Sequence, residues 1–150
     1  MPYKDMKLLK NFAGGLAGAI ALNILHEIVR RIYHDAPRVE LIGEEAVTKI
    51  SNAAGTEHPT GDTLYLTTLA GDVISNAMYY SAIGAAKKKH LVITGLGVGL
   101  SAGFGALKLT KPMGLSDAPV TRTNTTKALT VAWYTFGGLV AALTIKSLRK

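Results

Sequence analysis

Residues 91–109 of this 150-residue chain, LVITGLGVGLSAGFGALKL, decide the fold class. No charged residue occurs in residues 91–107. An α-helix rises about 1.5 Å per residue, so about 20 apolar residues match a hydrocarbon core of about 30 Å. A helix at the surface of a soluble bundle would instead carry charges at every third or fourth position. The stretch therefore predicts a transmembrane helix.

Three further stretches have similar length and apolar character, at residues 12–31, 64–86 and 128–145. Hydrophobic residues make up 48% of the chain and charged residues 18%, and the charges fall almost wholly between the four stretches. A bilayer sorts a sequence in this way. We therefore predict that residues 1–150 form a single all-α membrane domain, a four-transmembrane-helix bundle.

The first outer loop contains a periodic segment at residues 39–54. Val39, Ile42, Ala46 and Ile50 recur at helical spacing, and charged side chains occupy the opposite face. This pattern is typical of an amphipathic helix that lies at the membrane surface or caps a bundle. We predict such a surface helix here.

The basic residues indicate contact with membrane lipids. The net charge is +7, and short basic clusters occur at residues 4–10, 87–89 and 146–150, at the ends of the predicted spans. The positive-inside bias then places the N- and C-termini in the cytoplasm, and we expect a bacterial inner (cytoplasmic) membrane. Aromatic residues do not interleave the basic clusters, so we expect no nucleic-acid partner. The chain has no cysteine, which excludes disulfides and thiolate metal sites.

Small residues mark the helix faces that we expect to pack. Glycines recur four residues apart in the third stretch, and a similar spacing occurs in the first and fourth. Such faces allow two helix backbones to approach closely. The pattern fits a contact within one chain and an interface between copies in a homo-oligomer equally well. The predicted packing residues are Gly14, Gly18, Gly95, Gly99, Gly103 and Gly138.

Polar side chains form one stripe on each of the first two predicted spans. Residues at i, i+3, i+4 and i+7 share one helix face. Ionisable groups at membrane depth are costly, and they often mark function. We expect Glu27 and Asp72 to lie at similar depth and to face each other across the hairpin. The candidate residues for ion or substrate binding are Asn23, His26, Glu27, Arg30, Thr68, Asp72, Asn76 and Tyr79.

The same charges also have a structural interpretation. Glu27 can pair with Arg31 one turn away, and the nearest candidate cations for Asp72 are His26 and Arg30 across the hairpin. Such ion pairs could fix the register of the two helices and serve no other purpose.

Metal and cofactor chemistry finds little support in the sequence. The outer loop contains residues of metal-ligating type without recognisable ligand spacing, so a metal site stays unknown and we predict no cofactor. These residues are His34, Asp35, Glu57, His58 and Asp62.

Three functions remain open for the chain, in order of preference. The first is passage of an ion, a proton or a small solute through the polar intramembrane site. The second is a structural or partner-binding membrane subunit whose buried charges only lock helix packing. The third is a membrane-embedded enzyme, which we rank last because no serine or threonine has an evident base partner and no phosphate-binding loop is present.

Overall fold

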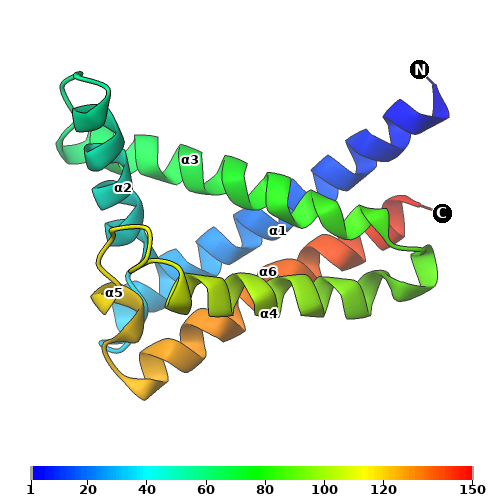
Figure 1. Ribbon diagram of the computed structural model, residues 1–150. Helices are drawn as coiled ribbons and strands as arrows, with labels where there is room; N and C mark the ends of the chain where they lie inside the picture. Colours follow the sequence, from blue (N-terminus) through cyan, green and yellow to red (C-terminus); the bar gives the residue numbers. More distant parts are fainter. Residues whose placement is uncertain (1, 150) are drawn as a thin grey trace.

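The computed structural model describes residues 2–149, and this part of the chain is helical without a β-strand. Figure 1 shows long helices that run lengthwise, with a shorter helix across one end. The elements in chain order are α1 (Tyr3–Ile32), α2 (Val39–Ala53), α3 (Gly61–Ser81), η1 (Ala82–Ala85), η2 (Lys88–His90), α4 (Leu91–Lys108), α5 (Ala118–Thr121) and α6 (Asn124–Leu148).

Three of the described helices are long and apolar enough to cross a membrane, which indicates a membrane protein. They are α1, α4 with the turn before it (Lys88–Lys108), and α6. Helix α3, whose apolar run is interrupted by Asp72 and Asn76, falls outside this set.

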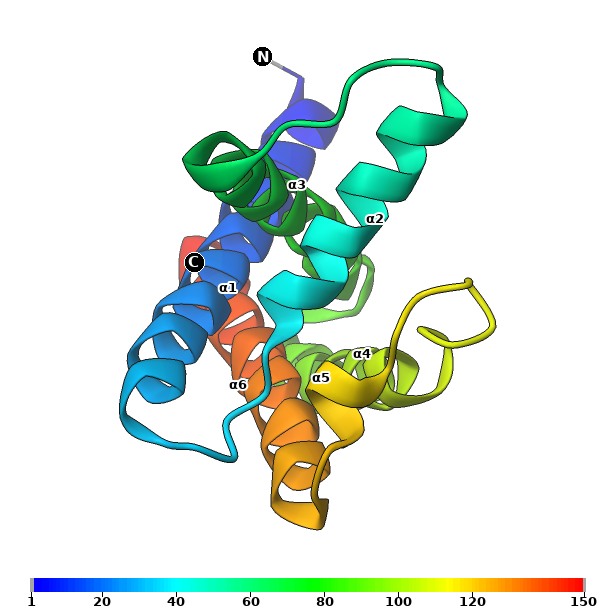
Figure 2. The same cartoon turned by 90° about the vertical axis from the view of Figure 1, so that its left-hand side faces the viewer.

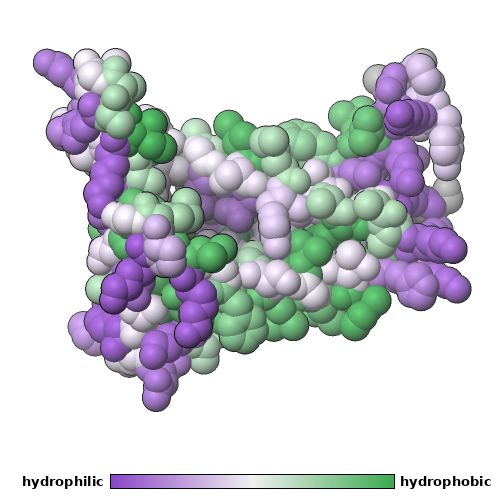
Figure 3. Space-filling model, in the orientation of Figure 1, coloured by the Kyte–Doolittle hydropathy of each residue, from purple (hydrophilic) through white to green (hydrophobic). Residues whose placement is uncertain are grey.

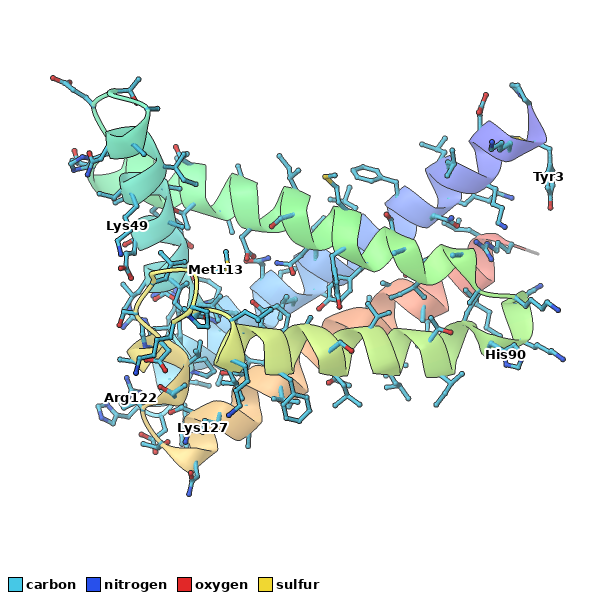
Figure 4. All side chains as sticks on the ribbon, viewed as in Figure 1. Tyr3, Lys49, His90, Met113, Arg122 and Lys127 are labelled. Atoms are coloured by element: carbon cyan, nitrogen blue, oxygen red, sulfur yellow. The ribbon has the colours of Figure 1, made fainter. Side chains whose placement is uncertain are left out.

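The surface of the molecule is divided into an apolar middle and two polar ends. Figure 3 shows apolar side chains gathered around the middle of the bundle and hydrophilic residues at both ends. Lys49 and Arg122 lie at one end, and His90 and Tyr3 lie at the other (Figure 4). Large apolar side chains on the outside of the middle region, such as Leu100 of the helix that spans residues 91–108, remain exposed in the isolated chain. This distribution suits a protein surrounded by lipid.

The helix ends differ from the predicted span ends for local reasons. Helix α1 begins well before residue 12, because exposed lysines are good helix formers and continue the helix into solvent. Helix α3 ends at Ser81 and gives way to the 3₁₀ turn η1, within the predicted span of residues 64–86. Helix α6 begins at Asn124 because the Thr123 side chain accepts a hydrogen bond from the Thr126 backbone N–H.

Glycine allows α4 and α6 to pack backbone against backbone. A Cβ atom added to Gly99 would lie 2.6 Å from the Tyr134 carbonyl oxygen, and one added to Gly95 would lie 2.6 Å from the carbonyl oxygen of Gly138. A Cβ on Gly103 would lie 2.6 Å from the Cα of Val131. Only glycine fits at these crossings without moving a helix.

Helix α1 lies between α6 and α3 and makes close contacts with both. Gly14 packs against Ile145 of α6, and a Cβ on Gly18 would lie 2.5 Å from the carbonyl oxygen of Gly137. On its other side, Gly15 packs directly against the backbone of Ala77 in α3. All six glycines predicted to pack therefore lie at contacts within one chain.

Both chain termini and the α3–α4 turn lie at the same end of the bundle (Figure 1). Arg149 ties this end together, because its guanidinium donates 3.1 Å to the Ala86 carbonyl and 2.6 Å to the Asn11 side-chain oxygen. It also donates to the carbonyl of Gly84.

Helix α3 diverges from α4 towards the opposite end (Figure 1), and α2 crosses that end (Figure 2). Gly43 of α2 packs against the Thr68 methyl group of α3. The loop after α4 packs on α2, where the Ser116 backbone N–H donates 2.9 Å to the Glu45 carboxylate. Close contact at one end and divergence at the other leave a cavity inside the bundle.

Candidate functional site

The cavity has a volume of about 930 Å³ and is lined by α1, α2, α3, α4, α6 and the loop after α4. Figure 3 shows a hollow between α3 and α4 in which hydrophilic surface lies deeper than the apolar rim. Most lining side chains are apolar, as in sites for small molecules. The predicted site residues that line it are Asn23, His26, Glu27, Thr68, Asp72, Asn76 and Tyr79.

Asp72 is held by two neutral amides. The Asn23 side-chain NH₂ donates 2.8 Å to one carboxylate oxygen, and the Asn76 NH₂ donates 3.0 Å to the other. Both N–H hydrogens of each amide are used, since Asn23 also donates to the Ala19 carbonyl and Asn76 to the Asp72 carbonyl. Among the described residues Asp72 forms no ion pair.

The expected pairing of Asp72 with His26 or Arg30 is therefore not found. The physical reason is competition for these two groups. His26 lies 2.8 Å from the Glu40 carboxylate, and Arg30 is bonded to Glu27. Neutral amides from α1 and from α3 itself take their place at Asp72.

Glu27 belongs to a different cluster, at the end of the cavity near α2. Arg30 donates to both of its carboxylate oxygens, at 2.7 and 2.9 Å, and Arg31 donates at 2.8 Å. The hydroxyl of Tyr65 in α3 donates 3.1 Å to the same carboxylate. Glu27 and Asp72 line one cavity, but each has its own partners. The predicted Glu27–Arg31 contact is present, whereas Arg30 pairs with Glu27 and does not itself line the cavity.

Glu40 is a site residue that the sequence does not single out, since it is one of the charged residues opposite the apolar face of residues 39–54. Its carboxylate lies in the cavity, accepts from Arg38, and pairs with His26 of α1. Burial raises the pKa of Glu40, but the hydrogen bonds from His26 and Arg38 outweigh burial, so the pKa lies below its ordinary value. Helical periodicity shows which residues share a face and does not show which face meets another helix.

Two buried polar atoms in the cavity wall have no hydrogen-bond partner. They are the Nδ1 of His26 and the Oγ1 of Thr68, whose residues are 8% and 5% exposed. Buried polar groups in folded proteins are almost always paired, so each exception calls for an explanation. The His26 and Trp133 rings also pack in a T-shaped arrangement, with ring centroids 5.4 Å apart.

Tyr79 lies at the mouth of the cavity. Its ring is partly exposed, and its hydroxyl donates 3.3 Å to the Val98 carbonyl of α4. This is a direct hydrogen bond between α3 and α4 on the terminal side of the hollow.

The outer-loop residues of metal-ligating type do not form a metal site. Within residues 2–149, no group of three or more histidine, aspartate or glutamate side chains could hold a metal ion. His58, for example, lies 3.3 Å from the Asn52 side chain.

The site thus combines a large apolar cavity, an ion-paired cluster at one end and a carboxylate without a cation deeper inside. Comparison of the chain with protein-family models, curated proteins and solved structures finds no match.

Proposed function

We propose that the protein is an integral membrane protein that binds an ion or small solute at Asp72 and passes it across the bilayer. The observation that carries this proposal is the pairing of Asp72, whose carboxylate lines a large cavity with only neutral amides as partners. A carboxylate at membrane depth is costly, and the structural role of an ion pair does not account for it here. Binding of a cation would compensate its charge.

In this proposal α3 is a fourth span that turns its polar stripe to the cavity. The outer surface of α3 supports this orientation, since Leu66, Ile74 and Met78 are 60%, 57% and 63% exposed. These apolar side chains would face lipid, while Asp72 and Asn76 face the protein. Helix α2 would lie at the outer membrane surface, where its exposed Ile50 reaches the boundary between headgroups and acyl chains.

Passage in this proposal requires a conformational change. Between the cavity and the end that carries the termini lies a layer of fully buried side chains, namely Tyr80, Ile83, Leu91 and Ile145. A packed apolar layer of this kind excludes water and ions. We therefore favour a carrier, in which this layer opens after the solute has bound, over a permanently open pore.

Flux from proteoliposomes tests the proposal. The wild-type protein should release protons, Na⁺ or K⁺ faster than protein-free liposomes do, and Asp72→Asn should remove the difference. Asp62→Asn is a matched control, because Asp62 lies on the same helix, is exposed and does not line the cavity. Wild-type flux at the protein-free level, or equal flux from wild type and Asp72→Asn, would contradict passage at Asp72.

A structural or partner-binding subunit is the second candidate, and the cluster around Glu27 favours it. Arg30, Arg31 and Tyr65 bind this carboxylate from two helices, which holds α1 against α3. In that case the chain would fold stably and show no flux, and Asp72→Asn would leave every functional readout unchanged.

A further inference from the structure

We propose that the cavity binds an amphipathic organic ammonium compound, with its ammonium group at Asp72 and its apolar part between α3 and α4. This inference rests on the proposed function, because it names the class of solute for the same site. It goes beyond that function by distinguishing a lipid-soluble amine from an inorganic cation or a proton.

The position of the hollow indicates an apolar ligand that arrives from the bilayer. The hollow lies between α3 and α4 in the middle of the molecule, where the surrounding surface is apolar (Figure 3). Leu69 and Val73 of α3 line it on one side, and Ala102 and Ala106 of α4 line it on the other. A volume of about 930 Å³ is far more than a bare ion needs and lies within the range of sites for drug-sized ligands.

The unused hydrogen-bonding capacity near Asp72 indicates a ligand that donates. A carboxylate can accept about four hydrogen bonds, and Asp72 receives one from the side chain of each asparagine, so acceptor capacity remains. The amide hydrogens of Asn23 and Asn76 are already used, which leaves their oxygens as acceptors. An ammonium group donates up to three hydrogen bonds, and its positive charge would compensate the negative charge of Asp72.

The two unpartnered atoms add a second, independent indication of a ligand. In the neutral tautomer that donates through Nε2 to the Glu40 carboxylate, the Nδ1 of His26 is an acceptor. The Thr68 hydroxyl can accept as well as donate. Both residues line the cavity, and the two atoms are buried just behind its surface, so a ligand becomes their partner when the side chains turn towards it. Trp133 and Tyr134 also line the cavity, and aromatic rings attract a cation placed over their faces.

Trp133 makes the test direct, because it is the only tryptophan in the chain and it lines the cavity. A brominated alkyl amine quenches tryptophan fluorescence on contact, and the brominated alcohol of equal chain length serves as the uncharged comparison. In nanodiscs the amine should quench Trp133 saturably, and the alcohol should bind about tenfold more weakly or worse, since it forms no charge-assisted hydrogen bond. Asp72→Asn should remove this preference for the amine, and Asp62→Asn should keep it.

Thr68→Val provides a second variant that keeps the shape of the cavity. Because the Thr68 hydroxyl has no partner in the unliganded protein, its removal should leave the thermal unfolding temperature equal or higher. The same variant should bind the amine several-fold more weakly, on the order of one lost hydrogen bond. Unchanged amine affinity in both Thr68→Val and Asp72→Asn would overturn the assignment.

The quenching and flux experiments fail in different ways. Equal quenching by amine and alcohol, together with Asp72-dependent flux of protons or Na⁺, would reject the ammonium ligand and retain passage. Selective amine quenching without flux would retain the ligand and reject passage. Failure of both readouts would reject the two proposals together.

Discussion

Glu27 and Asp72 lie on neighbouring helices and line the same cavity, yet their surroundings give them opposite energetic roles. Glu27 is surrounded by two arginines and a tyrosine hydroxyl. Asp72 has two amides. Removing the charge of Glu27 leaves arginines without their partner, whereas removing the charge of Asp72 leaves no cation behind.

This difference predicts a contrast between two conservative variants. Glu27→Gln should lower the free energy of unfolding by about 2–3 kcal/mol, less than for a fully buried pair because the Glu27 side chain is 28% exposed. Asp72→Asn should change it by less than about 1 kcal/mol, since the loss of one hydrogen bond is offset by removal of a buried charge. Denaturant titration in detergent measures both. A larger cost for Asp72→Asn than for Glu27→Gln would mean that Asp72 holds the helices together.

The lowered pKa of Glu40 predicts that part of the stability of the fold depends on pH. The Glu40 pKa is lower in the folded protein than in the unfolded chain, so its contribution to stability is complete above the ordinary pKa of a glutamate side chain and is lost as the pH falls through the folded pKa. Unfolding between about pH 7 and pH 3 should therefore show a steeper loss for wild type than for Glu40→Gln.

Glu45→Gln is the control for this experiment. Glu45 lies on the same helix, and the Lys49 ammonium lowers its pKa as well, but the pair is exposed. Salt screens exposed pairs, so the part of the Glu45→Gln effect that comes from Lys49 should shrink at high ionic strength, leaving the hydrogen bond from Ser116, while the effect of Glu40→Gln persists. Identical acid profiles for wild type and Glu40→Gln would show that Glu40 does not stabilise the fold.

At the scale of elements, α4 offers two glycines in different surroundings. Gly99 is buried against the backbone of α6, whereas nothing lies within 4 Å of a Cβ added to Gly97. Gly99→Leu should force the two helices apart and cost about 2 kcal/mol or more. Gly97→Leu should change stability by less than about 0.5 kcal/mol, because its side chain would extend into the surroundings.

Thermal unfolding and gel filtration in the same detergent compare these two variants. If Gly97→Leu were the more damaging change, the outer face of α4 would be a contact surface for another chain. Equal behaviour of both variants would show that the α4–α6 crossing is looser than the structure indicates.

The elements themselves were largely predictable, since apolar length alone places helices at α1, α4 and α6. The two polar stripes could also be predicted, because helical spacing fixes which residues share a face. What periodicity could not supply is the pairing between elements. The contact of His26 with Glu40 depends on α2 crossing the bundle end, and no local pattern around residue 40 encodes that crossing.

At the scale of the whole molecule, both termini and the α3–α4 turn meet at one end, and α2 lies at the other (Figure 1). If four helices cross the membrane, Lys88 and Glu57 lie on opposite sides. The chain has no cysteine, so Lys88→Cys and Glu57→Cys each create a unique thiol. An impermeant thiol reagent should label Glu57→Cys in intact cells, and Lys88→Cys only after lysis. Labelling of both positions before lysis would rule out this topology.

The glycine face of α4 has a consequence for the order in which the chain assembles. Helices α1 and α3 can join through Gly15 and Ala77 as soon as α3 has been synthesised. Helix α4 has to wait, because the surface around Gly99 fits α6, which is made later. Until α6 has been synthesised, the glycine face of α4 has no partner and is open to contact with other helices in the membrane. The interval between the synthesis of α4 and that of α6 is therefore the stage at which a newly made chain is most exposed to wrong helix pairing and to proteases that remove unassembled proteins.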